Sequence, residues 1–480
     1  MSKEIGITSK KSEDFSEWYT QVVIKAQLAD YAPVKGLIVL RPYGYSIWEF
    51  LKSSVDQKLK ATGHENAFLP VLIPESLLSR EATHFAGFTP EVFWVTYSGD
   101  SEIGDRLALR PTSETLAYSM YSKWIKSWRD LPLKINFWNS ALRAEIKATK
   151  PFLRTSEFLW QEGHTVHAEK EEAENEVTSI LEMYRKTVEE ELAIPVILGK
   201  KSDKEKFVGA IYTTTMESIM PDGKALQMGT SHFLGQNFSK PFDVKFLDRQ
   251  NVETFAWQTS WGISWRLIGA LIMVHGDDKG LVLPPRVAPI QAVIIPIYSS
   301  QEDKDSVLNK ASEIKENISK GGIRVHLDSR DEFTPGYKFH DWEMKGVPLR
   351  IEIGPKDLSK NKVVLARRDN MKKTDVAFEV LVDGTINALN DIQSDLFARA
   401  KTILSSKTKD VTEFSQFKKE IENGMFVRSP WCGSQKCEET IKEDTGADIR
   451  VIPFDAKSSE FPCIVCKSPS KTTAMFARGY

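Results

Sequence analysis

The sequence predicts a multidomain chain of mixed α and β structure, and three observations support that prediction. Its 480 residues correspond to about three domains of ordinary size. A proline-rich stretch at residues 283–289 separates a long first segment from a regular alternation of short apolar runs and amphipathic helices. All the cysteines fall in the last 49 residues, at Cys432, Cys437, Cys463 and Cys466. We therefore expect domains at residues 1–285, 286–398 and 399–480.

Composition and charge exclude several classes of protein. Hydrophobic residues make up 41% of the chain and charged residues 27%, which is typical of globular proteins and excludes a disordered one. No apolar run approaches the roughly 18 residues of a membrane-spanning helix, and the first residues show no secretion signal. We therefore expect a cytoplasmic location and no membrane partner. Because the net charge is only -2, any site for a polyanion must be local.

Local patterns predict the elements of the first two domains. In the first domain we expect a strand at 36–40, a turn at 41–44, and helices at 16–30, 45–60 and 171–192. The last helix is the clearest, because its apolar residues share one face: Val177, Leu181, Tyr184 and Val188. In the second domain we expect a helix at 302–320 and strands at 291–298, 323–327, 349–353 and 362–366. This pattern indicates an α/β module.

One segment of the first domain is dense in side chains suited to binding a nucleotide. Residues 138–162 predict a strand, a basic loop and a return strand. Arg143 and Glu145 would share one face of the first strand, where a guanidinium grips phosphate and a carboxylate accepts hydrogen bonds from an amino group. Such a pair alone is more often a surface ion pair. Two further basic positions and an aromatic in the return strand favour the nucleotide site.

This segment resembles motif 2 of the class II aminoacyl-tRNA synthetases, Arg-x-Glu followed by a loop and Arg-x-x-x-Phe. Residues 63–70 resemble motif 1, and residues 262–266 resemble motif 3. Further matches resemble prolyl-tRNA synthetases of the archaeal and eukaryotic-like type, at residues 14–22, 28–36, 110–114, 229–232 and 274–280. The resemblance implies an α+β catalytic domain with an antiparallel sheet of six strands, an α/β anticodon-binding domain and a small α/β zinc domain at the C-terminus.

The same resemblance implies a reaction in two steps. Proline and ATP form prolyl-adenylate, and the 3′ end of tRNA(Pro) then accepts the prolyl group. Neither step needs a protein nucleophile, so positioning and charge stabilisation with Mg²⁺ carry the chemistry. Motif 1 implies a homodimer. Only 100 residues separate Glu162 from Gly262, which leaves no room for the internal editing domain of bacterial-type relatives.

The resemblance also assigns site residues one by one. Arg143 contacts the α-phosphate and the proline carboxylate, Glu145 reads the adenine amino group, and Phe158 stacks on adenine. Arg154 and Arg266 hold the outer phosphates, so Arg143 and Arg266 are the catalytic candidates. The remaining ATP positions are Thr155, Gln227, Thr230 and Ser264. The proline positions are Thr112, Glu114, Arg143, Trp160, Glu162 and His232. A carboxylate such as that of Glu114 suits the charged secondary amine of proline.

A locally basic stretch marks the expected tRNA contact. Residues 338–373 contain ten Lys or Arg and five Asp or Glu, which from composition alone suits an ordinary charged face equally well. Their resemblance to the anticodon-binding domain of class IIa synthetases favours RNA. Proline anticodons carry two guanines, whose edges offer both donors and acceptors. We expect Glu343 to meet the donors and Arg350 or Lys356 to meet the acceptors.

The cysteine spacing, Cys432-x4-Cys437 and Cys463-x2-Cys466, predicts a structural zinc site. Free or disulfide-bonded cysteines are the alternatives, and a reducing compartment disfavours disulfides. The absence of cysteine before residue 432 argues against a threonyl-type relative, which is expected to use a cysteine ligand for a catalytic zinc.

Two questions stay open at this stage. The last residues, 477–480, resemble the family's ending, in which the carboxylate of the terminal tyrosine reaches towards the catalytic domain, whereas a frayed end is the simple alternative. A catalytically inactive relative or a tRNA-binding scaffold are the other function classes. The presence of all candidate ATP arginines and of Glu145 disfavours the inactive relative, and the intact catalytic half disfavours the scaffold. Misactivation of cysteine or alanine stays possible.

Overall fold

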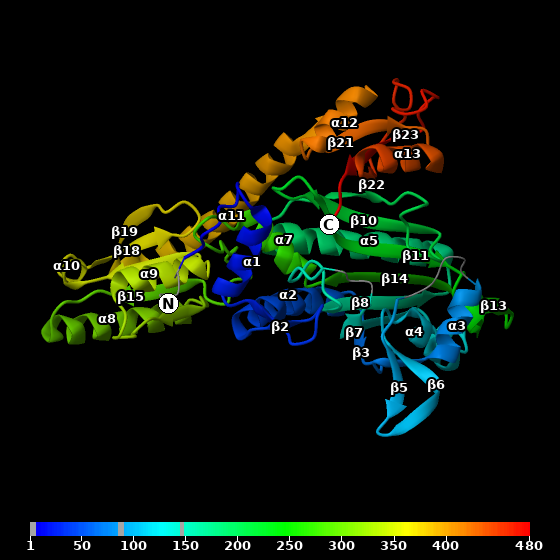
Figure 1. The fold of residues 1–480 in the computed structure, drawn as a ribbon. Coiled ribbons are helices and arrows are strands. Elements are labelled where there is room, and N and C mark those ends of the chain that lie inside the picture. Colours follow the sequence, from blue (N-terminus) through cyan, green and yellow to red (C-terminus); the bar gives the residue numbers. More distant parts are fainter. Residues whose placement is uncertain (1–5, 85–90, 145–147) are drawn as a thin grey trace.

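The computed structural model describes residues 6–84, 91–144 and 148–480. A large sheet occupies the centre of the molecule, with a second α/β module at one side and the C-terminal module above it (Figure 1). No helix in these described ranges combines the length and the apolar character that crossing a membrane requires.

The central sheet confirms the predicted antiparallel catalytic fold. Six neighbouring strands pair antiparallel, in the order β9 (Ile197–Lys200), β10 (Tyr212–Ile219), β11 (Ala225–Gly235), β14 (Trp257–Ser264), β8 (Glu157–His167) and β7 (Leu133–Leu142). A seventh strand, β3 (Glu65–Ala67), pairs parallel to β7 at the edge. This short strand follows α2 (Pro42–Ala61) and precedes Pro70, so the motif 1 segment runs from helix to strand as expected.

Helices cover the sheet because each has one apolar face. The helix expected at 171–192 is α5 (Lys170–Glu191), and all four of its predicted core residues are buried against the sheet. α1 (Phe15–Lys25) and α7 (Arg266–His275) pack in the same core. The turn expected at 41–44 is wrong, because α2 already begins at Pro42. Proline suits the first position of a helix, where its missing N–H has no partner to lose.

The second module is the expected α/β unit. Its sheet has the order β16 (Val325–Leu327), β15 (Ala292–Pro296), β17 (Leu349–Ile353), β18 (Lys362–Arg367) and β19 (Lys373–Ala377). The first three strands are parallel and the last two pairings are antiparallel. α8 (Gln301–Lys320) buries Val307, Ala311, Ile314 and Ile318 against this sheet, as its sequence pattern predicts.

The C-terminal module extends the central sheet. Its strands are β20 (Thr408–Asp410), β21 (Phe426–Trp431), β23 (Thr472–Ala477) and β22 (Asp448–Pro453), and β22 pairs with β9 of the catalytic sheet. Its helices are α12 (Phe414–Glu422) and α13 (Gln435–Thr445). α11 (Leu381–Lys407) joins this module to the second one, and the position of the expected boundary at 398 lies inside this helix.

The remaining elements are short. They are β1 (Ala29–Tyr31), β2 (Ile38–Leu40), β4 (Leu72–Pro74), α3 (Glu75–His84), β5 (Trp94–Ser98), β6 (Ser101–Leu109), α4 (Glu114–Trp124), α6 (Ser239–Phe242), β12 (Lys245–Leu247), β13 (Glu253–Phe255), α9 (Pro335–Met344) and α10 (Pro355–Leu358), with 3-10 turns at Trp128–Asp130 and Phe378–Val380. Residues 168–256, between motifs 2 and 3, form α5, α6, three strands of the central sheet and the β12–β13 hairpin.

Candidate active site

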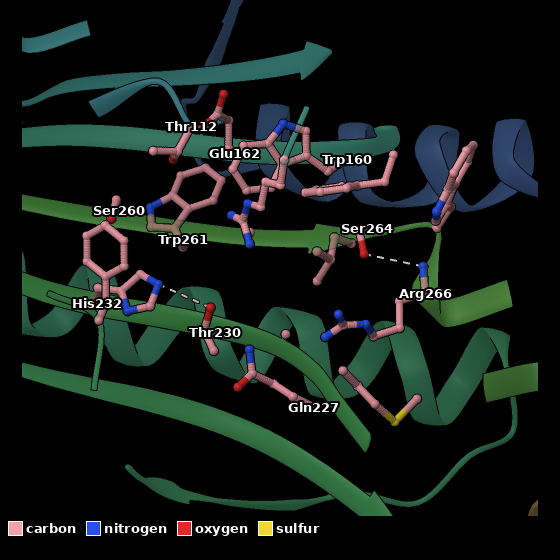
Figure 2. A pocket seen from close by; sticks show the side chains of 18 of the residues that line it. Thr112, Trp160, Glu162, Gln227, Thr230, His232, Ser260, Trp261, Ser264 and Arg266 are labelled. Carbon is pink, nitrogen blue, oxygen red and sulfur yellow. Dashed lines mark hydrogen bonds between the residues drawn. The ribbon is translucent and has the colours of Figure 1, made fainter. Parts of the chain in front are cut away.

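A cavity of about 480 Å³ lies on one face of the central sheet. Strands β8, β11 and β14 carry most of its wall, and Figure 2 shows their side chains converging on it. All predicted ATP and proline positions among the described residues line this cavity: Thr112, Glu114, Arg143, Arg154, Thr155, Phe158, Trp160, Glu162, Gln227, Thr230, His232, Ser264 and Arg266. Glu145 lies outside the described residues.

Arg143 lies just beyond β7 rather than within it, so the expected strand position is wrong for this residue. Its backbone N–H still bonds to the carbonyl of Ser156, but the N–H of Ala144 bonds to the carbonyl of Glu91, which draws the chain away from β8. The guanidinium of Arg143 lies 5.3 Å from the centre of the Phe158 ring and 6.0 Å from the Trp160 ring. This stacking aims a cation into the cavity.

One end of the cavity is cationic. Arg143, Arg154 and Arg266 line it together, and Arg266 is the first residue of α7. The backbone N–H of Arg266 donates to Ser264 Oγ at 3.3 Å, which links the two motif 3 positions (Figure 2). Burial, followed by the neighbouring charge of Arg143, lowers the pKa of Arg266 to about 10, so the group still carries its proton at neutral pH. Three close positive charges make this end a site for a polyanion.

The other end of the cavity is acidic and buried. Glu162 is 1% exposed, and its carboxylate accepts hydrogen bonds from Asn139 Nδ2 at 3.0 Å, from the Ser113 backbone N–H at 3.2 Å and from the Ser113 hydroxyl. Burial would raise the pKa of Glu162, but the contact with His164 and the other donors outweigh it and hold that pKa below its usual value. Glu114 follows Ser113 and accepts a hydrogen bond from the Thr112 hydroxyl. This end suits a small cationic amine.

His232 forms a neutral part of the wall at the level of Ser260, beyond Glu162 on the side away from Arg266 (Figure 2). Its Nδ1 lies 2.9 Å from Thr213 Oγ1 and its Nε2 lies 3.1 Å from Thr230 Oγ1. Burial, with the charge of His164, lowers the pKa of His232 to about 3. The ring of Phe207 lies against it with centroids 4.7 Å apart. His232 therefore acts as an uncharged hydrogen-bonding wall at neutral pH.

Several lining residues escaped the sequence analysis: Glu205, Phe207, Thr213, Ser260 and Trp261. Ser260 lies two and four residues before Gly262 and Ser264 on β14, so strand alternation would have placed it on the same face. Glu205 and Phe207 come from the loop between β9 and β10, where no periodic signal exists.

Tyr480 also lines the cavity, so the last residues dock instead of fraying. Its phenol donates a hydrogen bond of 2.6 Å to Asp222, and its backbone N–H donates to the carbonyl of Ala225 at 3.2 Å. The Nζ atoms of Lys150 and Lys224 lie 5.9 and 5.2 Å from its ring. The C-terminal module thereby contributes a side chain to a cavity in the catalytic sheet.

Two of the three expected anticodon residues lie together in the second module. Arg350 Nη1 donates to Glu343 Oε1 at 2.9 Å, and its Nε donates to Glu352 Oε1 at 3.0 Å. The Arg350 guanidinium also stacks 4.1 Å from the Phe339 ring centre. Lys356 lies exposed on α10, beyond the opposite end of β17.

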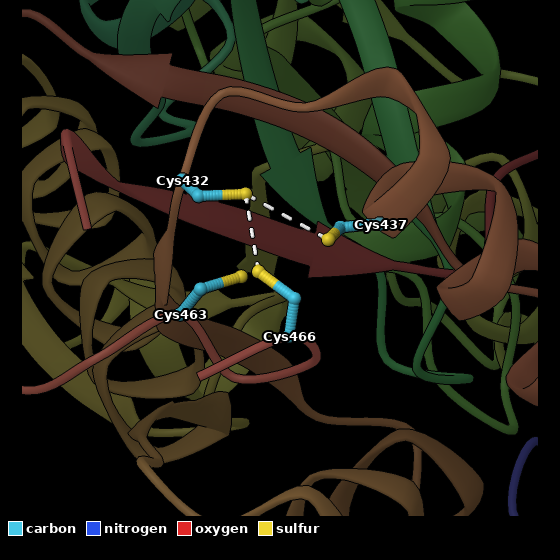
Figure 3. A group of neighbouring side chains, drawn as sticks. All are labelled: Cys432, Cys437, Cys463 and Cys466. Atoms are coloured by element: carbon cyan, nitrogen blue, oxygen red, sulfur yellow. Dashed lines mark hydrogen bonds between the residues drawn. The ribbon is translucent and has the colours of Figure 1, made fainter. Parts of the chain in front are cut away.

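The four cysteines lie together, as Figure 3 shows. Their sulfur atoms lie within 4.8 Å of one another, with Cys432 Sγ 3.7 Å from the Sγ atoms of both Cys437 and Cys466. Four thiolates bound to zinc at about 2.3 Å in tetrahedral geometry lie about 3.8 Å apart. The donor set and its spacing therefore fit a tetrathiolate zinc site, and all four cysteines are unbridged.

Comparison with known proteins gives a consistent family. Residues 93–275 match the tRNA synthetase class II core domain (G, H, P, S and T), residues 291–387 match the anticodon binding domain, and residues 414–480 match the prolyl-tRNA synthetase C-terminal domain. These matches cover the cavity, the Glu343–Arg350 pair and the cysteine cluster in turn.

Full-length relatives agree. The chain is 66% identical over 477 residues to the proline–tRNA ligase of Cenarchaeum symbiosum, covering 99% of this chain and 100% of the relative. It is 51% identical to the proline–tRNA ligase of Natranaerobius thermophilus, covering 98% of this chain and 97% of the relative. It is 49% identical to the proline–tRNA ligase 2 of Bacillus cereus (strain ATCC 10987 / NRS 248) over the full length of both chains. With the antiparallel class II sheet and a cavity lined by residues of motifs 2 and 3, these matches place the chain in the proline–tRNA ligase family of class II aminoacyl-tRNA synthetases.

Proposed function

We propose that the cavity joins proline to ATP as prolyl-adenylate and then transfers the prolyl group to the 3′ end of tRNA(Pro). One observation carries this proposal: a single cavity has a cationic end and a buried acidic end. A reaction between a polyphosphate and an amino acid needs both ends, and the cavity volume lies in the range of small-molecule sites. Family membership supports the same reaction.

Each end has a distinct task in this proposal. Arg143 holds the α-phosphate beside the proline carboxylate, and Arg154 and Arg266 neutralise the outer phosphates, with Mg²⁺ bound to the nucleotide. Phe158 stacks on adenine, and Glu145 reads its amino group. Positioning by these fixed cations stabilises charge as it develops on the leaving pyrophosphate. The other ATP contacts in the proposal are Thr155, Gln227, Thr230 and Ser264.

The proline ring lies at the acidic end. Its secondary ammonium faces the carboxylates of Glu114 and Glu162, with Thr112 orienting Glu114. Trp160 and the uncharged His232 wall the ring, and the hydrogen bonds around Glu162 keep its charge in place before substrate arrives. This preorganisation reduces the cost of binding a small substrate.

The remaining expectations belong to the same proposal. Glu343, Arg350 and Lys356 read the anticodon, the cysteine cluster holds one structural zinc ion, and two chains associate through the motif 1 segment in the cytoplasm. We propose the catalytic, anticodon-binding and zinc domains at residues 1–285, 286–398 and 399–480. The matched anticodon-binding and C-terminal domains support these assignments at the level of whole modules.

Amino-acid-dependent exchange of pyrophosphate into ATP, measured with each of the twenty amino acids, tests the proposal. Proline should give the largest rate. No response to proline would contradict the proposal and favour an inactive relative or a tRNA-binding scaffold. Responses to cysteine and alanine in the same experiment measure misactivation.

A further inference from the structure

A buried ion network links the C-terminal module to the catalytic sheet. Glu217 on β10 is fully buried, and Oε2 of its carboxylate accepts hydrogen bonds from Arg450 Nε at 3.2 Å and Nη2 at 3.1 Å. Lys201, just after β9, donates to Glu217 Oε1 at 2.6 Å and to the backbone carbonyl of Arg450 at 2.9 Å. Arg450 belongs to β22, so one carboxylate joins two modules.

The network lies on the same face of the sheet as the cavity. Glu217 pairs directly with Gln227 of β11, and directly opposed residues of antiparallel strands point to the same face. Gln227 lines the cavity, whereas Glu217, its neighbour on the same face, is not among the lining residues. Glu217 therefore adjoins Gln227, one of the proposed ATP contacts, without lining the cavity itself.

Arg450 also contacts the segment that carries Tyr480. A Cβ atom at Gly479 would lie 2.5 Å from Arg450 Nη1, so the guanidinium packs directly on the glycine backbone. The same segment is held by Ala225, whose N–H bonds to the carbonyl of Arg478 at 2.8 Å and whose carbonyl accepts from Tyr480. Figure 1 shows the chain end returning from the C-terminal module to the sheet beside β10.

The electrostatics of the network favour a role at the phosphate end. Glu217 and Arg450 are opposite charges that both lie close enough to Arg266 to act on its guanidinium, in opposite directions. Because buried charges interact strongly, loss of either residue would change the field and the position of the ATP wall.

We propose that Glu217 and Arg450 are positioning residues for ATP, through which the C-terminal module holds Gln227, Arg266 and the Gly479–Tyr480 segment in register with the cavity. This inference rests on the proposed reaction. It assigns the C-terminal module a part in adenylate formation in addition to any part in its own folding. Neither residue touches substrate, so both act through the residues that do.

The test compares Arg450→Ala and Glu217→Gln with the unchanged protein in proline-dependent pyrophosphate exchange. Removing one partner of a buried ion network should raise the KM for ATP about tenfold or more. The KM for proline should change less than about twofold, because the acidic end of the cavity lies elsewhere. Calorimetric titration of ATP and of proline separately should show the same split. Arg450→Lys keeps the charge and a single donor group, so its KM for ATP should lie between those of the unchanged protein and Arg450→Ala.

Arg428→Ala is the matched control, because this arginine of the same module pairs with Asp410 inside the module, with Arg428 Nη1 3.5 Å from Asp410 Oδ1. It should leave the KM for ATP unchanged. Zinc content and thermal unfolding are measured on every variant. If Arg450→Ala does not fold, Gly479→Ala replaces it, since the added Cβ displaces the guanidinium without removing a charge.

Two results would overturn the inference. The first is an unchanged KM for ATP in folded Arg450→Ala or Gly479→Ala, and the second is an equal rise of both KM values. Failure of the unchanged protein to respond to proline would instead contradict the proposed function, so the two failures are distinguishable.

Discussion

The carboxylate of Glu162 accepts a hydrogen bond of 3.0 Å from the side-chain amide of Asn139 on the neighbouring strand β7. Glu162 and Asn139 project from adjacent strands of the sheet, and Ser113 at the start of α4 completes the shell of donors. A negative charge is thus held in a buried wall before any substrate binds. Preorganised charge of this kind separates recognition of the amine from recognition of the phosphates.

Replacement of Glu162 by Gln should therefore raise the KM for proline about tenfold or more, because the ammonium would lose its buried counter-charge. The KM for ATP should stay within about twofold of the unchanged protein, since the arginines lie at the other end. Pyrophosphate exchange with each substrate varied in turn measures both values. Glu171→Gln, an exposed glutamate on α5, is the control. Equal increases in both KM values would contradict the separate amine site.

The anticodon proposal predicts a different separation. Arg350→Ala should lower aminoacylation of tRNA(Pro) about tenfold or more, because each bidentate contact with a guanine edge contributes about 1–3 kcal/mol. Proline-dependent pyrophosphate exchange should stay near normal, since it needs no tRNA. Arg324→Ala provides a control in the same module, where this arginine donates to the carbonyl of Ala288. Equal loss of both activities would contradict the assignment.

Loss of the zinc ion should lower the stability of the protein, because the proposed zinc site is structural. Protein purified without chelator should contain about one zinc per chain, since four thiolates close a single tetrahedral site. Cys463→Ser removes a fully buried ligand, so zinc content and the thermal unfolding temperature should both fall. Metal analysis and scanning calorimetry measure these effects, and Ser458→Ala, at an exposed position of the same loop, is the control. Absence of zinc from the unchanged protein would contradict the site.

Stability should fall as pH decreases below about 6.5, the ordinary pKa of histidine in an unfolded chain. Burial lowers the pKa of His275 to about 4 and of His167 to about 4. Between these values the unfolded chain binds protons that the folded chain does not, so unfolding becomes more favourable as pH falls. Each buried histidine contributes about 1.4 kcal/mol per pH unit in this window.

His275→Gln tests this origin of acid sensitivity. His275 bonds to the carbonyl of Leu192 at 2.8 Å, and Lys11 and Arg399 disfavour its charged form. Glutamine keeps a donor but does not titrate, so the dependence of unfolding free energy on pH between about 4 and 6.5 should become shallower. Urea unfolding at several pH values measures this slope, and the value at pH 7.5 corrects for altered packing. An unchanged slope would assign the acid sensitivity to other groups.

Local patterns predicted individual elements well where one face of the element is apolar. α5 and α8 lie within one residue of their expected bounds, because apolar spacing and a stop signal act over a few residues. The start of α2 escaped prediction, since Pro42 reads equally as a turn and as a first helical residue. The strand predicted at Arg143 ends one residue earlier, because the N–H of Ala144 bonds to the carbonyl of Glu91. Glu91 is distant in the sequence, so no local pattern could indicate this contact.

The sequence by itself indicated the chemistry of this protein through the arginines of motifs 2 and 3, the carboxylates near them, the spacing of four cysteines and the resemblance to a family with a defined reaction. These features depend on residue type and short separations, which the chain displays directly. Only the tertiary structure decided that β22 continues the catalytic sheet, that Arg450 meets Glu217 across 233 positions, and that Phe207 lies against His232. Contacts between distant segments depend on how whole elements pack, and no local pattern encodes that packing.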